Sequence, residues 1–405
     1  MRSGLRFLIL NTDYPDFLSW FYAKHPRLAK KPFDEQMRIR AESLFGVADF
    51  YSSNLRKLGH EAHDVHANNE FMQKAWAREH GVRFEEPTQL RQEWRRALQQ
   101  ARRLAARAPL RYLKPLLRPA LRSLDGQRAW FYDILAAQIR SYKPDVLFNQ
   151  AMDGIGNRFL REMKPSVGLL VGQIASPLPR GEEFTGYDLV ISSLPNLVEY
   201  FRGLGLPSEL SRFAFEPAVL PRLKHRGRDT PVSFVGSLSR VHQARVRFLE
   251  HLCSSLDVRV WGSGVDGLPQ DSLIRSRYMG TAWGIEMYQI LQASKMTLNH
   301  HIGIAESYAN NMRLYEATGV GSLLITDWKV NLHEIFEPGR EVVAYRSPEE
   351  CAEVIEYYLG HSEEREAIAR AGQSRTLGEH TYYQRVQELV GIVARHVSHR
   401  SAAGH

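Results

Sequence analysis

The stretch from Ala309 to Trp328, ANNMRLYEATGVGSLLITDW, restricts the fold more than any other part of the chain. Met312 and Glu316 lie one helical turn apart, and two glycines mark the end of the predicted helix. The apolar run from Ser322 to Thr326 has the length and composition of a buried parallel strand. A helix, a tight turn and a buried strand in this order predict an α/β fold built on a parallel sheet.

Polar residues in this stretch predict a binding site. Ligands of open parallel sheets bind outside the carboxyl ends of the strands, where the amino ends of helices converge. The predicted nucleotide-binding residues are Asn310, Asn311, Arg313 and Glu316. They supply amide donors, a fixed cation for a phosphate and a carboxylate for ribose hydroxyls. An N-capped amphipathic helix with an exposed arginine and glutamate is the alternative interpretation.

The chain has 405 residues, which favours two domains of roughly 200 residues each. Its composition, with 43% hydrophobic and 24% charged residues, is typical of a soluble globular enzyme. No apolar run approaches the roughly 18 residues of a membrane span, and the run from Leu5 to Leu10 is too short for a signal peptide. We therefore expect a cytoplasmic protein. Its two cysteines are too few for a disulfide framework or a cysteine metal site.

The net charge of +8 is concentrated in one segment. Residues 78–128 contain 13 Lys and Arg against 5 Asp and Glu, so the rest of the chain is close to neutral. The pattern predicts a basic helical insertion at about residues 70–130 of the first domain. Such an insertion suits an acidic acceptor or peripheral contact with the anionic inner face of a membrane, and a solvated helical arm is the alternative. No nucleic-acid-binding motif accompanies the charge, so nucleic acid is not an expected partner.

Apolar segments of the first half are typical of a Rossmann-like sheet: LRFLILNTD, DVLFNQ, VGLLVGQIA and YDLVISS. Two candidate catalytic bases follow them. Asp13 ends the first segment, and Asp153 lies on a glycine-flanked loop after the second. An Asp in a loop is also a common turn former. Aromatic residues between Tyr14 and Tyr22 fit stacking on a sugar and packing in a core equally well.

A proline-rich linker, FAFEPAVLPRLKHRGRDTP, precedes a second α/β unit. That unit opens with VSFVGSLSRVHQARVRFLEHL, in which Gly236 ends a strand and Arg240, His242 and Arg245 lie near the start of a helix. This arrangement predicts a diphosphate-binding turn, although a single glycine turn is not specific.

A later strand ends in two adjacent histidines, His300 and His301. Neighbours on a strand point to opposite faces, and no Asp or Glu accompanies them at familiar ligand spacing, so a metal site is not expected. We expect one of them to be packed and the other, His301, to line the crevice.

Taken together, these segments resemble the glycosyltransferases of the GT-B fold, and most closely the CgeB-like bacterial group. The resemblance rests on YDLVISSLPNLVEYFRGLGL with FAFEPAV, on FVGSLSR, on NNMRLYEATGVGSLLITD, and on GREVVAYRSPEECAEVIEYYL with EREAIARAGQSRTLGEHTYYQRVQEL. Residues 14–130 carry no such resemblance.

The resemblance implies two Rossmann-like domains facing a cleft. Residues 1–217 would form the acceptor domain, residues 218–382 the donor domain, and residues 383–405 a closing helix and tail. Carried over by position, Glu316 would bind the donor ribose, and Arg240 and Arg313 would neutralise the diphosphate. The fold usually needs no metal, and the nucleoside diphosphate sugar is a substrate, so no cofactor is expected.

The predicted activity is transfer of a sugar from a nucleoside diphosphate sugar to a hydroxyl of a glycan, lipid or metabolite. Retaining members of a related family carry a second Glu eight residues before Glu316, where this chain has Tyr308, and Glu306 is out of register. Retention and inversion therefore both stay open, and in an inverting reaction Asp153 or Asp13 would deprotonate the acceptor. A non-catalytic nucleotide-sugar-binding subunit, or an epimerase or hydrolase on the same fold, are the alternatives.

Overall fold

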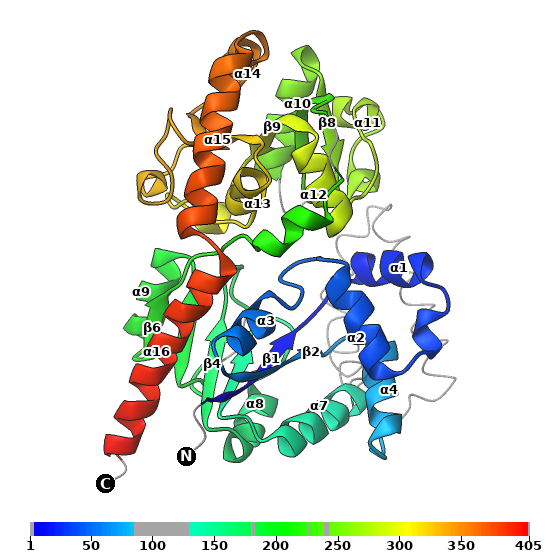
Figure 1. Ribbon diagram of the computed structural model, residues 1–405, viewed down its shortest axis with the longest axis vertical. Coiled ribbons are helices and arrows are strands. Elements are labelled where there is room, and N and C mark those ends of the chain that lie inside the picture. Colours follow the sequence, from blue (N-terminus) through cyan, green and yellow to red (C-terminus); the bar gives the residue numbers. More distant parts are fainter. Residues whose placement is uncertain are drawn as a thin grey trace, which may run out of the picture.

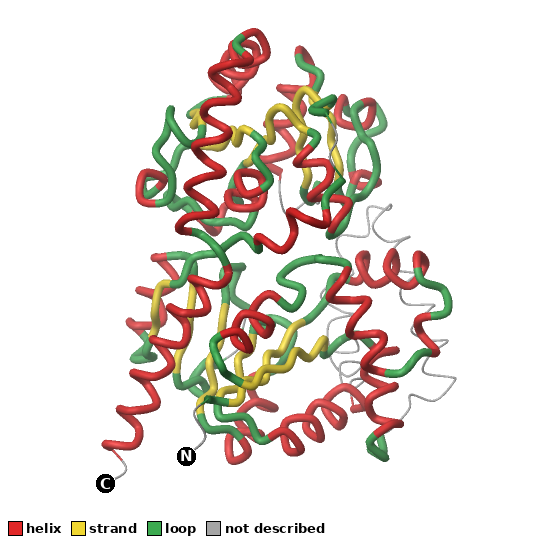
Figure 2. The backbone as a smooth tube through the Cα atoms, in the orientation of Figure 1, coloured by secondary structure: helices red, strands yellow, loops and turns green. Residues whose placement is uncertain are grey.

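The computed structural model describes residues 4–84, 129–179, 181, 183–224, 227–238 and 243–403. In these residues the chain forms two α/β domains that lie one above the other in Figure 1. Each domain has its own group of strands, as Figure 2 shows, and this confirms the predicted pair of parallel-sheet domains. No helix in the described ranges is long and apolar enough to cross a membrane.

The N-terminal sheet has six parallel strands in the order β2-β1-β3-β4-β5-β6. Its strands are β1 (Arg6–Asn11), β2 (Glu61–His66), β3 (Val146–Asn149), β4 (Leu169–Gln173), β5 (Leu189–Ser192) and β6 (Ser208–Leu210). Its helices are α1 (Pro15–Lys24), α2 (Phe33–Glu42), α3 (Phe50–Lys57), α4 (Glu70–Glu79), α7 (Ala129–Tyr142), α8 (Asn157–Met163) and α9 (Pro195–Gly203). Strands β1, β3, β4 and β5 come from the four predicted apolar segments, β2 follows the turn at Gly59 and His60 where the sequence LGHEAHDVHAN predicts a second strand, and the short edge strand β6 was not predicted.

The C-terminal sheet has five parallel strands in the order β11-β10-β9-β7-β8. Its strands are β7 (Thr230–Val235), β8 (Val258–Trp261), β9 (Ser294–Asn299), β10 (Leu323–Asp327) and β11 (Val343–Tyr345). Its helices are α10 (Gln243–Ser255), α11 (Leu273–Ser276), α12 (Ile285–Gln292), α13 (Arg313–Gly319), α14 (Pro348–Gly360) and α15 (Ser362–Glu379). The helix and strand predicted from Ala309 to Trp328 are α13 and β10, and both are confirmed.

In both sheets the strand order reverses at the first strand of the sheet. In the N-terminal sheet the third strand pairs with the first on the side away from the second, and β9 pairs with β7 in the same way. Ligands of such sheets bind in the crevice outside the carboxyl ends of the strands at this switch point. The topology therefore directs attention to the ends of β1, β7 and β9.

The chain crosses between the domains twice. The first crossing lies near Phe215, and the second connects α15 to α16 (Tyr382–Ala403), which leaves the upper domain and runs down the lower one in Figure 1. The crossings are paired, because Phe215 N donates to His380 O at 2.8 Å and Tyr382 N donates to Phe215 O at 2.9 Å. Phe215 and Tyr382 belong to one buried cluster that also contains Tyr288 and Tyr315, so apolar packing joins the two domains.

The basic helical insertion expected at about residues 70–130 lies for the most part outside the described residues, since the structure omits 85–128. Helix α4 occupies the beginning of the expected range.

His380 at the second crossing gives the fold a specific acid sensitivity. Its Nε2 bonds to Ile335 O at 2.9 Å, and its Nδ1 accepts from Arg385 at 3.0 Å, an arrangement that requires the neutral ring. Burial is the main reason that the pKa of His380 falls to about 4. Because the unfolded chain binds this proton near pH 6.5 and the folded chain does not, stability is lost as pH falls from about 6.5 towards 4.

We expect His380→Gln to remove this part of the acid sensitivity, since the amide can keep both hydrogen bonds without titrating. Between pH 7 and pH 4.5 the unfolding free energy of the wild type should fall by about 2–3 kcal/mol more than that of the variant. Urea unfolding at both pH values measures the difference. Burial also raises the pKa of Asp64 to about 6, so this carboxyl group increases stability as the pH falls. Because Asp64 is present in both proteins, the difference between them isolates the effect of His380. Parallel losses in the two proteins would contradict the assignment.

Candidate active site

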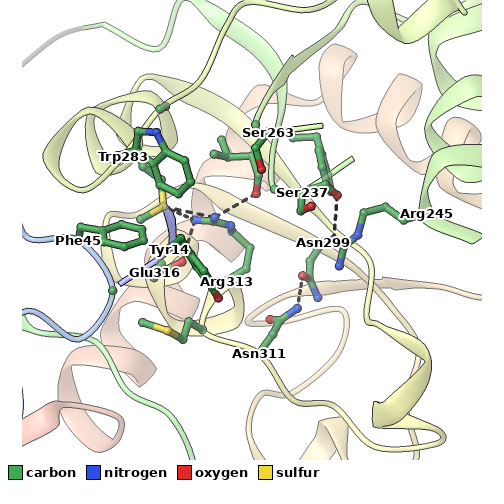
Figure 3. Close-up of a pocket in the computed structure, with 18 of the residues that line it drawn as sticks. Tyr14, Phe45, Ser237, Arg245, Ser263, Trp283, Asn299, Asn311, Arg313 and Glu316 are labelled. Carbon is green, nitrogen blue, oxygen red and sulfur yellow. Dashed lines mark hydrogen bonds and ion pairs between the residues drawn. The ribbon is translucent and has the colours of Figure 1, made fainter. Parts of the chain in front are cut away.

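A cavity of about 750 Å³ lies between the two domains (Figure 3). The C-terminal domain contributes residues that follow β7, β8 and β9 and residues at the start of α13. The N-terminal domain contributes Tyr14, Pro15, Asp16, Phe45 and Gly46. The volume lies within the range of small-molecule sites, and the location is the switch point that the topology indicates.

One end of the cavity is polar and contains a half-buried cation. Arg245 on α10 donates to Ser237 O at 3.2 Å and to His300 O at 3.0 Å, and its Nε has no hydrogen-bond partner among the described residues. No described carboxylate lies within 4 Å of its guanidinium. Burial, and next the charge of Arg313, lower the pKa of Arg245 to about 10. A positive charge that is this poorly compensated attracts an anionic ligand.

Asn299 and Asn311 lie at the same polar end. Asn311 Nδ2 donates to Asn299 Oδ1 at 2.6 Å, and Asn311 Oδ1 accepts from Leu314 N at 3.2 Å near the start of α13. Both asparagines line the cavity. Asn310, which was predicted beside Asn311, is buried and does not line it.

Arg313 and Glu316 lie in the middle of the cavity, as Figure 3 shows. Arg313 pairs with Glu316 at 2.8 Å and also donates to Val235 O at 3.0 Å and to the sulfur of Met287 at 3.3 Å. Burial raises the pKa of Glu316, and Arg313 opposes this shift. The ion pair therefore holds a buried carboxylate at the cavity wall.

Aromatic side chains form the opposite end. The ring centroids of Phe45 and Trp283 are 5.1 Å apart, and those of Tyr14 and Phe45 are 5.9 Å apart. These three residues line the cavity, whereas Phe17 and Phe21 are fully buried. Tyr14 is therefore available to stack on a ligand, whereas Phe17 and Phe21 pack in a core.

Two turns at the polar end approach each other closely. Gly236 N donates to Trp261 O at 2.9 Å, and Leu238 N donates to Ser263 O at 2.8 Å, so the turns after β7 and β8 are joined. Gly262 has φ +148°, and a Cβ atom added there would lie 1.8 Å from Gly236 O. Only glycine fits at this position.

Gly262→Ala should lower the unfolding free energy by more than about 2 kcal/mol, because the backbone at residues 236 and 262 must separate. Gly267→Ala is the matched control, since a Cβ added at Gly267 meets nothing within 4 Å. Urea unfolding measures both variants. Equal stability of the two variants would show that the close approach is not maintained in solution.

One of the two histidines at the end of β9 lines the cavity and the other is buried, as expected, but the prediction that His301 is the one at the cavity is wrong. His300 lines the cavity, whereas His301 is buried with its Nδ1 2.6 Å from Asp327. Neighbouring residues of an extended chain point to opposite sides, and sequence alone does not indicate which side faces the crevice. No group of three His, Cys, Asp or Glu in the described ranges is placed to hold a metal ion.

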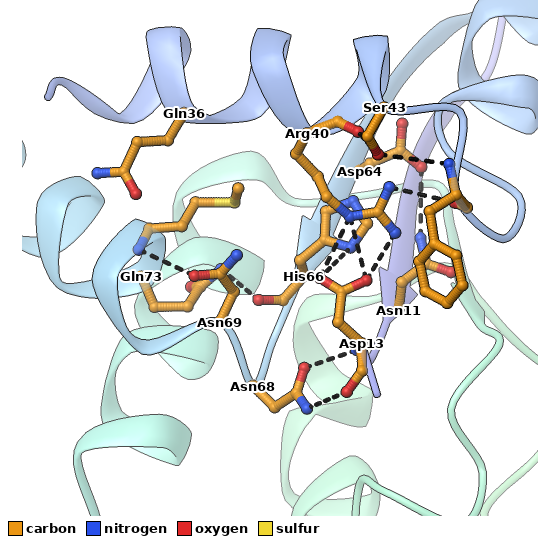
Figure 4. A network of polar contacts seen from close by, with 12 residues as sticks. Asn11, Asp13, Gln36, Arg40, Ser43, Asp64, His66, Asn68, Asn69 and Gln73 are labelled. Atoms are coloured by element: carbon orange, nitrogen blue, oxygen red, sulfur yellow. Dashed lines mark hydrogen bonds and ion pairs between the residues drawn. The ribbon is translucent and has the colours of Figure 1, made fainter. Parts of the chain in front are cut away.

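Asp13 belongs to a buried polar network in the N-terminal domain (Figure 4). Its carboxylate accepts from Arg40 at 2.6 and 3.1 Å and lies 3.3 Å from His66 Nδ1, and its side chain is 1% exposed. Burial raises the pKa of Asp13, but Arg40 and then His66 outweigh burial, so the pKa lies well below its usual range. Asp13 does not line the cavity, and its carboxylate is occupied by Arg40.

Asp153 has a different environment. It is exposed on the loop after β3. The pKa of Tyr14, which lines the cavity, is raised mainly by desolvation of Tyr14, and the charge of Asp153 adds to this shift. Tyr308, at the position of the second Glu, packs against the N-terminal core, and Glu306 is exposed. Neither Tyr308 nor Glu306 lines the cavity.

Of the predicted donor-site residues, Gly236, Asn311, Arg313 and Glu316 line the cavity. Arg240 lies outside the described residues. The prediction omitted Phe45, Ser263, Trp283 and Met287, which also line it. The only signals for them were turn-forming glycines next to aromatic residues, as in GTAWG, and such turns are common in proteins that bind nothing there.

The comparisons with known proteins agree with this fold. Residues 243–391 match the model of a family described as "Glycosyl transferase-like". No curated protein matches the chain.

Several solved structures share the fold over almost the whole chain. HepE from Anabaena, in complex with UDP and glucose, is 12% identical with a TM-score of 0.57, and the match covers 97% of this chain and 100% of that chain. A glycosyltransferase from Rickettsia africae is 9% identical with a TM-score of 0.57, covering 98% and 99%. AviGT4, a glycosyltransferase involved in avilamycin A biosynthesis, is 13% identical with a TM-score of 0.53, covering 98% of each chain. The chain therefore carries a glycosyl transferase-like domain at residues 243–391 and has the GT-B fold of glycosyltransferases.

Proposed function

We propose that this GT-B glycosyltransferase transfers a sugar from a nucleoside diphosphate sugar to a hydroxyl of a glycan, lipid or small metabolite. The observation that carries the proposal is the layout of the cavity. Arg245, which is half-buried and has no carboxylate within 4 Å among the described residues, lies at one end, a buried carboxylate, Glu316, in the middle, and aromatic rings at the other end. A nucleoside diphosphate presents a diphosphate, a ribose diol and a flat base in the same order.

Arg245 is the cation that we assign to the diphosphate, together with the amides of Asn299 and Asn311. Charge develops on the departing diphosphate during transfer, and a fixed cation in a site shielded from water stabilises that charge. Arg313 was predicted to have this role, but its guanidinium already pairs with Glu316. We propose that Arg313 orients Glu316 for the ribose hydroxyls. Asn310 and His301 do not line the cavity, so any contribution from them is indirect, and Arg240 stays a prediction.

For an inverting reaction we propose Asp153 as the base that accepts the proton of the acceptor hydroxyl. It is exposed on the loop after β3 and does not itself line the cavity, but its charge contributes to the raised pKa of Tyr14, which does line it. A retaining reaction would need no such base. Peripheral contact of the basic insertion with an anionic membrane or an acidic acceptor stays a proposal that rests on the charge of residues 78–128.

A thermal-shift screen against UDP, GDP, dTDP and CDP tests the donor site. A ligand that binds only the folded protein raises the melting temperature. Since HepE, of the same fold, was crystallised with UDP, we expect UDP to give a shift. Glu316→Ala should reduce the UDP shift and leave that of 2′,3′-dideoxy-UDP nearly unchanged, because that analogue has no diol to bind. A shift with a nucleotide but no consumption of any nucleotide sugar would favour the non-catalytic binding subunit, whereas the absence of a shift with every nucleotide would contradict the donor site.

A further inference from the structure

The loop of residues 43–48, between α2 and α3, has an unusual backbone. Leu44, Gly46 and Ala48 all have positive φ, at 57°, 61° and 41°. The left-handed conformation is unfavourable for the two non-glycine residues, and such strain persists where surrounding contacts enforce it. The contacts that hold this loop in its strained conformation therefore indicate its role.

Arg40 provides the contacts on the N-terminal side. Its Nη1 donates to Phe45 O at 3.2 Å while Nε and Nη2 hold Asp13, and its guanidinium lies over the Phe45 ring at 5.5 Å. Ser43 Oγ donates to Arg40 O at 2.7 Å. Figure 4 shows Arg40 between Asp13 and this loop. The ion pair with Asp13 thus holds the Arg40 guanidinium in place, and Arg40 in turn holds the backbone carbonyl of Phe45.

The C-terminal domain provides the contacts on the other side. Ser43 O accepts from Ile285 N at 2.9 Å, at the start of α12. A Cβ atom added at Gly284 would lie 1.9 Å from the same oxygen, so the two domains meet at a position that only glycine allows. Lys24 and Glu286 form an ion pair across the same boundary. The loop therefore docks on the domain that carries the donor-site residues.

This docking places Phe45 against Trp283, and both rings line the cavity. Without loop 43–48 the aromatic end would consist of residues of the C-terminal domain and the first turn of α1. We propose that loop 43–48 completes the nucleobase end of the donor cavity, and that Arg40 is the positioning residue that holds the loop there. This proposal rests on the proposed function, and it assigns a part of donor recognition to the domain that was expected to bind only the acceptor.

Comparing UDP with inorganic pyrophosphate separates the two ends of the cavity. Phe45→Ala should weaken UDP binding about tenfold, as expected for loss of a ring contact worth roughly 1.4 kcal/mol, and leave pyrophosphate binding unchanged. Phe45→Tyr keeps the ring and should retain wild-type affinity. Tyr200→Ala removes an exposed aromatic residue that does not line the cavity and is the matched control. Calorimetric titration measures all four proteins.

Arg40 is tested together with its partner, because removing one charge alone would leave the other buried and unpaired. The double variant Asp13→Asn/Arg40→Gln removes both charges of this buried pair, but the shorter side chain at residue 40 no longer reaches Phe45 O. A cooperative thermal transition checks its folding. We expect the same selective loss of UDP affinity as in Phe45→Ala.

Unchanged UDP affinity in Phe45→Ala, or equal losses for UDP and pyrophosphate, would overturn the proposal and leave the donor site intact. If the double variant folds and binds UDP as the wild type does, the role of Arg40 is refuted. Failure of the wild type to bind either ligand would instead overturn the proposed donor site, and the present proposal with it.

Discussion

Arg245→Ala should reduce turnover by about 100- to 1,000-fold and weaken the binding of both UDP and pyrophosphate. The reason is that Arg245 is a half-buried cation of the cavity with no carboxylate within 4 Å among the described residues, so a bound diphosphate would be its counter-ion. Losses of this size are typical when one preorganised charge-stabilising group is removed from an active site. Initial rates with UDP-glucose and calorimetric titration of both ligands measure the effect.

Arg247→Ala is the matched control for this experiment. Arg247 lies two residues further along α10, is exposed and does not line the cavity. Its removal changes the net charge by the same amount, so a general electrostatic effect would appear in both variants. We expect wild-type binding and turnover in Arg247→Ala. Equal losses in the two variants would mean that Arg245 attracts the donor only through overall charge.

The second large effect separates the two aspartates that were candidate bases. Asp153→Asn should lower turnover by about 100- to 10,000-fold if the reaction inverts, with little change in stability, because Asp153 is exposed. Asp13→Asn should instead cost about 3–5 kcal/mol of stability, because it leaves Arg40 buried without its partner. Urea unfolding and initial rates on both variants measure the two effects.

The opposite pattern would reverse the assignment. A stable Asp13→Asn variant that binds UDP and has lost turnover would identify Asp13 as the base. Full activity in Asp153→Asn, combined with retention of configuration in the product, would show that no base from this loop is needed. NMR of the product determines the configuration.

Local sequence patterns were sufficient for the architecture and for the centre of the site. The apolar runs predicted most strands, and the glycines and polar residues next to them predicted where those strands end. Gly236, Asn311, Arg313 and Glu316 were found in this way, because each lies within a few residues of the end of a strand or the start of a helix. The same reasoning missed β6, since three residues, Ser208–Leu210, are too few for a periodic pattern.

The contacts that decide the roles of side chains were beyond the sequence. Arg40 and Asp13 are 27 residues apart, and nothing near either residue indicates that they pair. Phe45 and Trp283 come from different domains and meet only because loop 43–48 docks on α12. Whether His300 or His301 faces the cavity depends on how β9 lies between its neighbours.

The sequence by itself therefore determined two parallel-sheet domains and the edge of each sheet that faces the cavity. Hydrophobic periodicity and strand-end residues are properties of short segments, so they can be interpreted before the chain is folded. Only the tertiary structure decided which polar groups lie paired inside the protein and which remain available to a ligand. Pairing and burial depend on segments that are distant along the chain. In this protein they turn Asp13 into a structural partner of Arg40 and leave Arg245 with no carboxylate within 4 Å in the part of the chain that the structure describes.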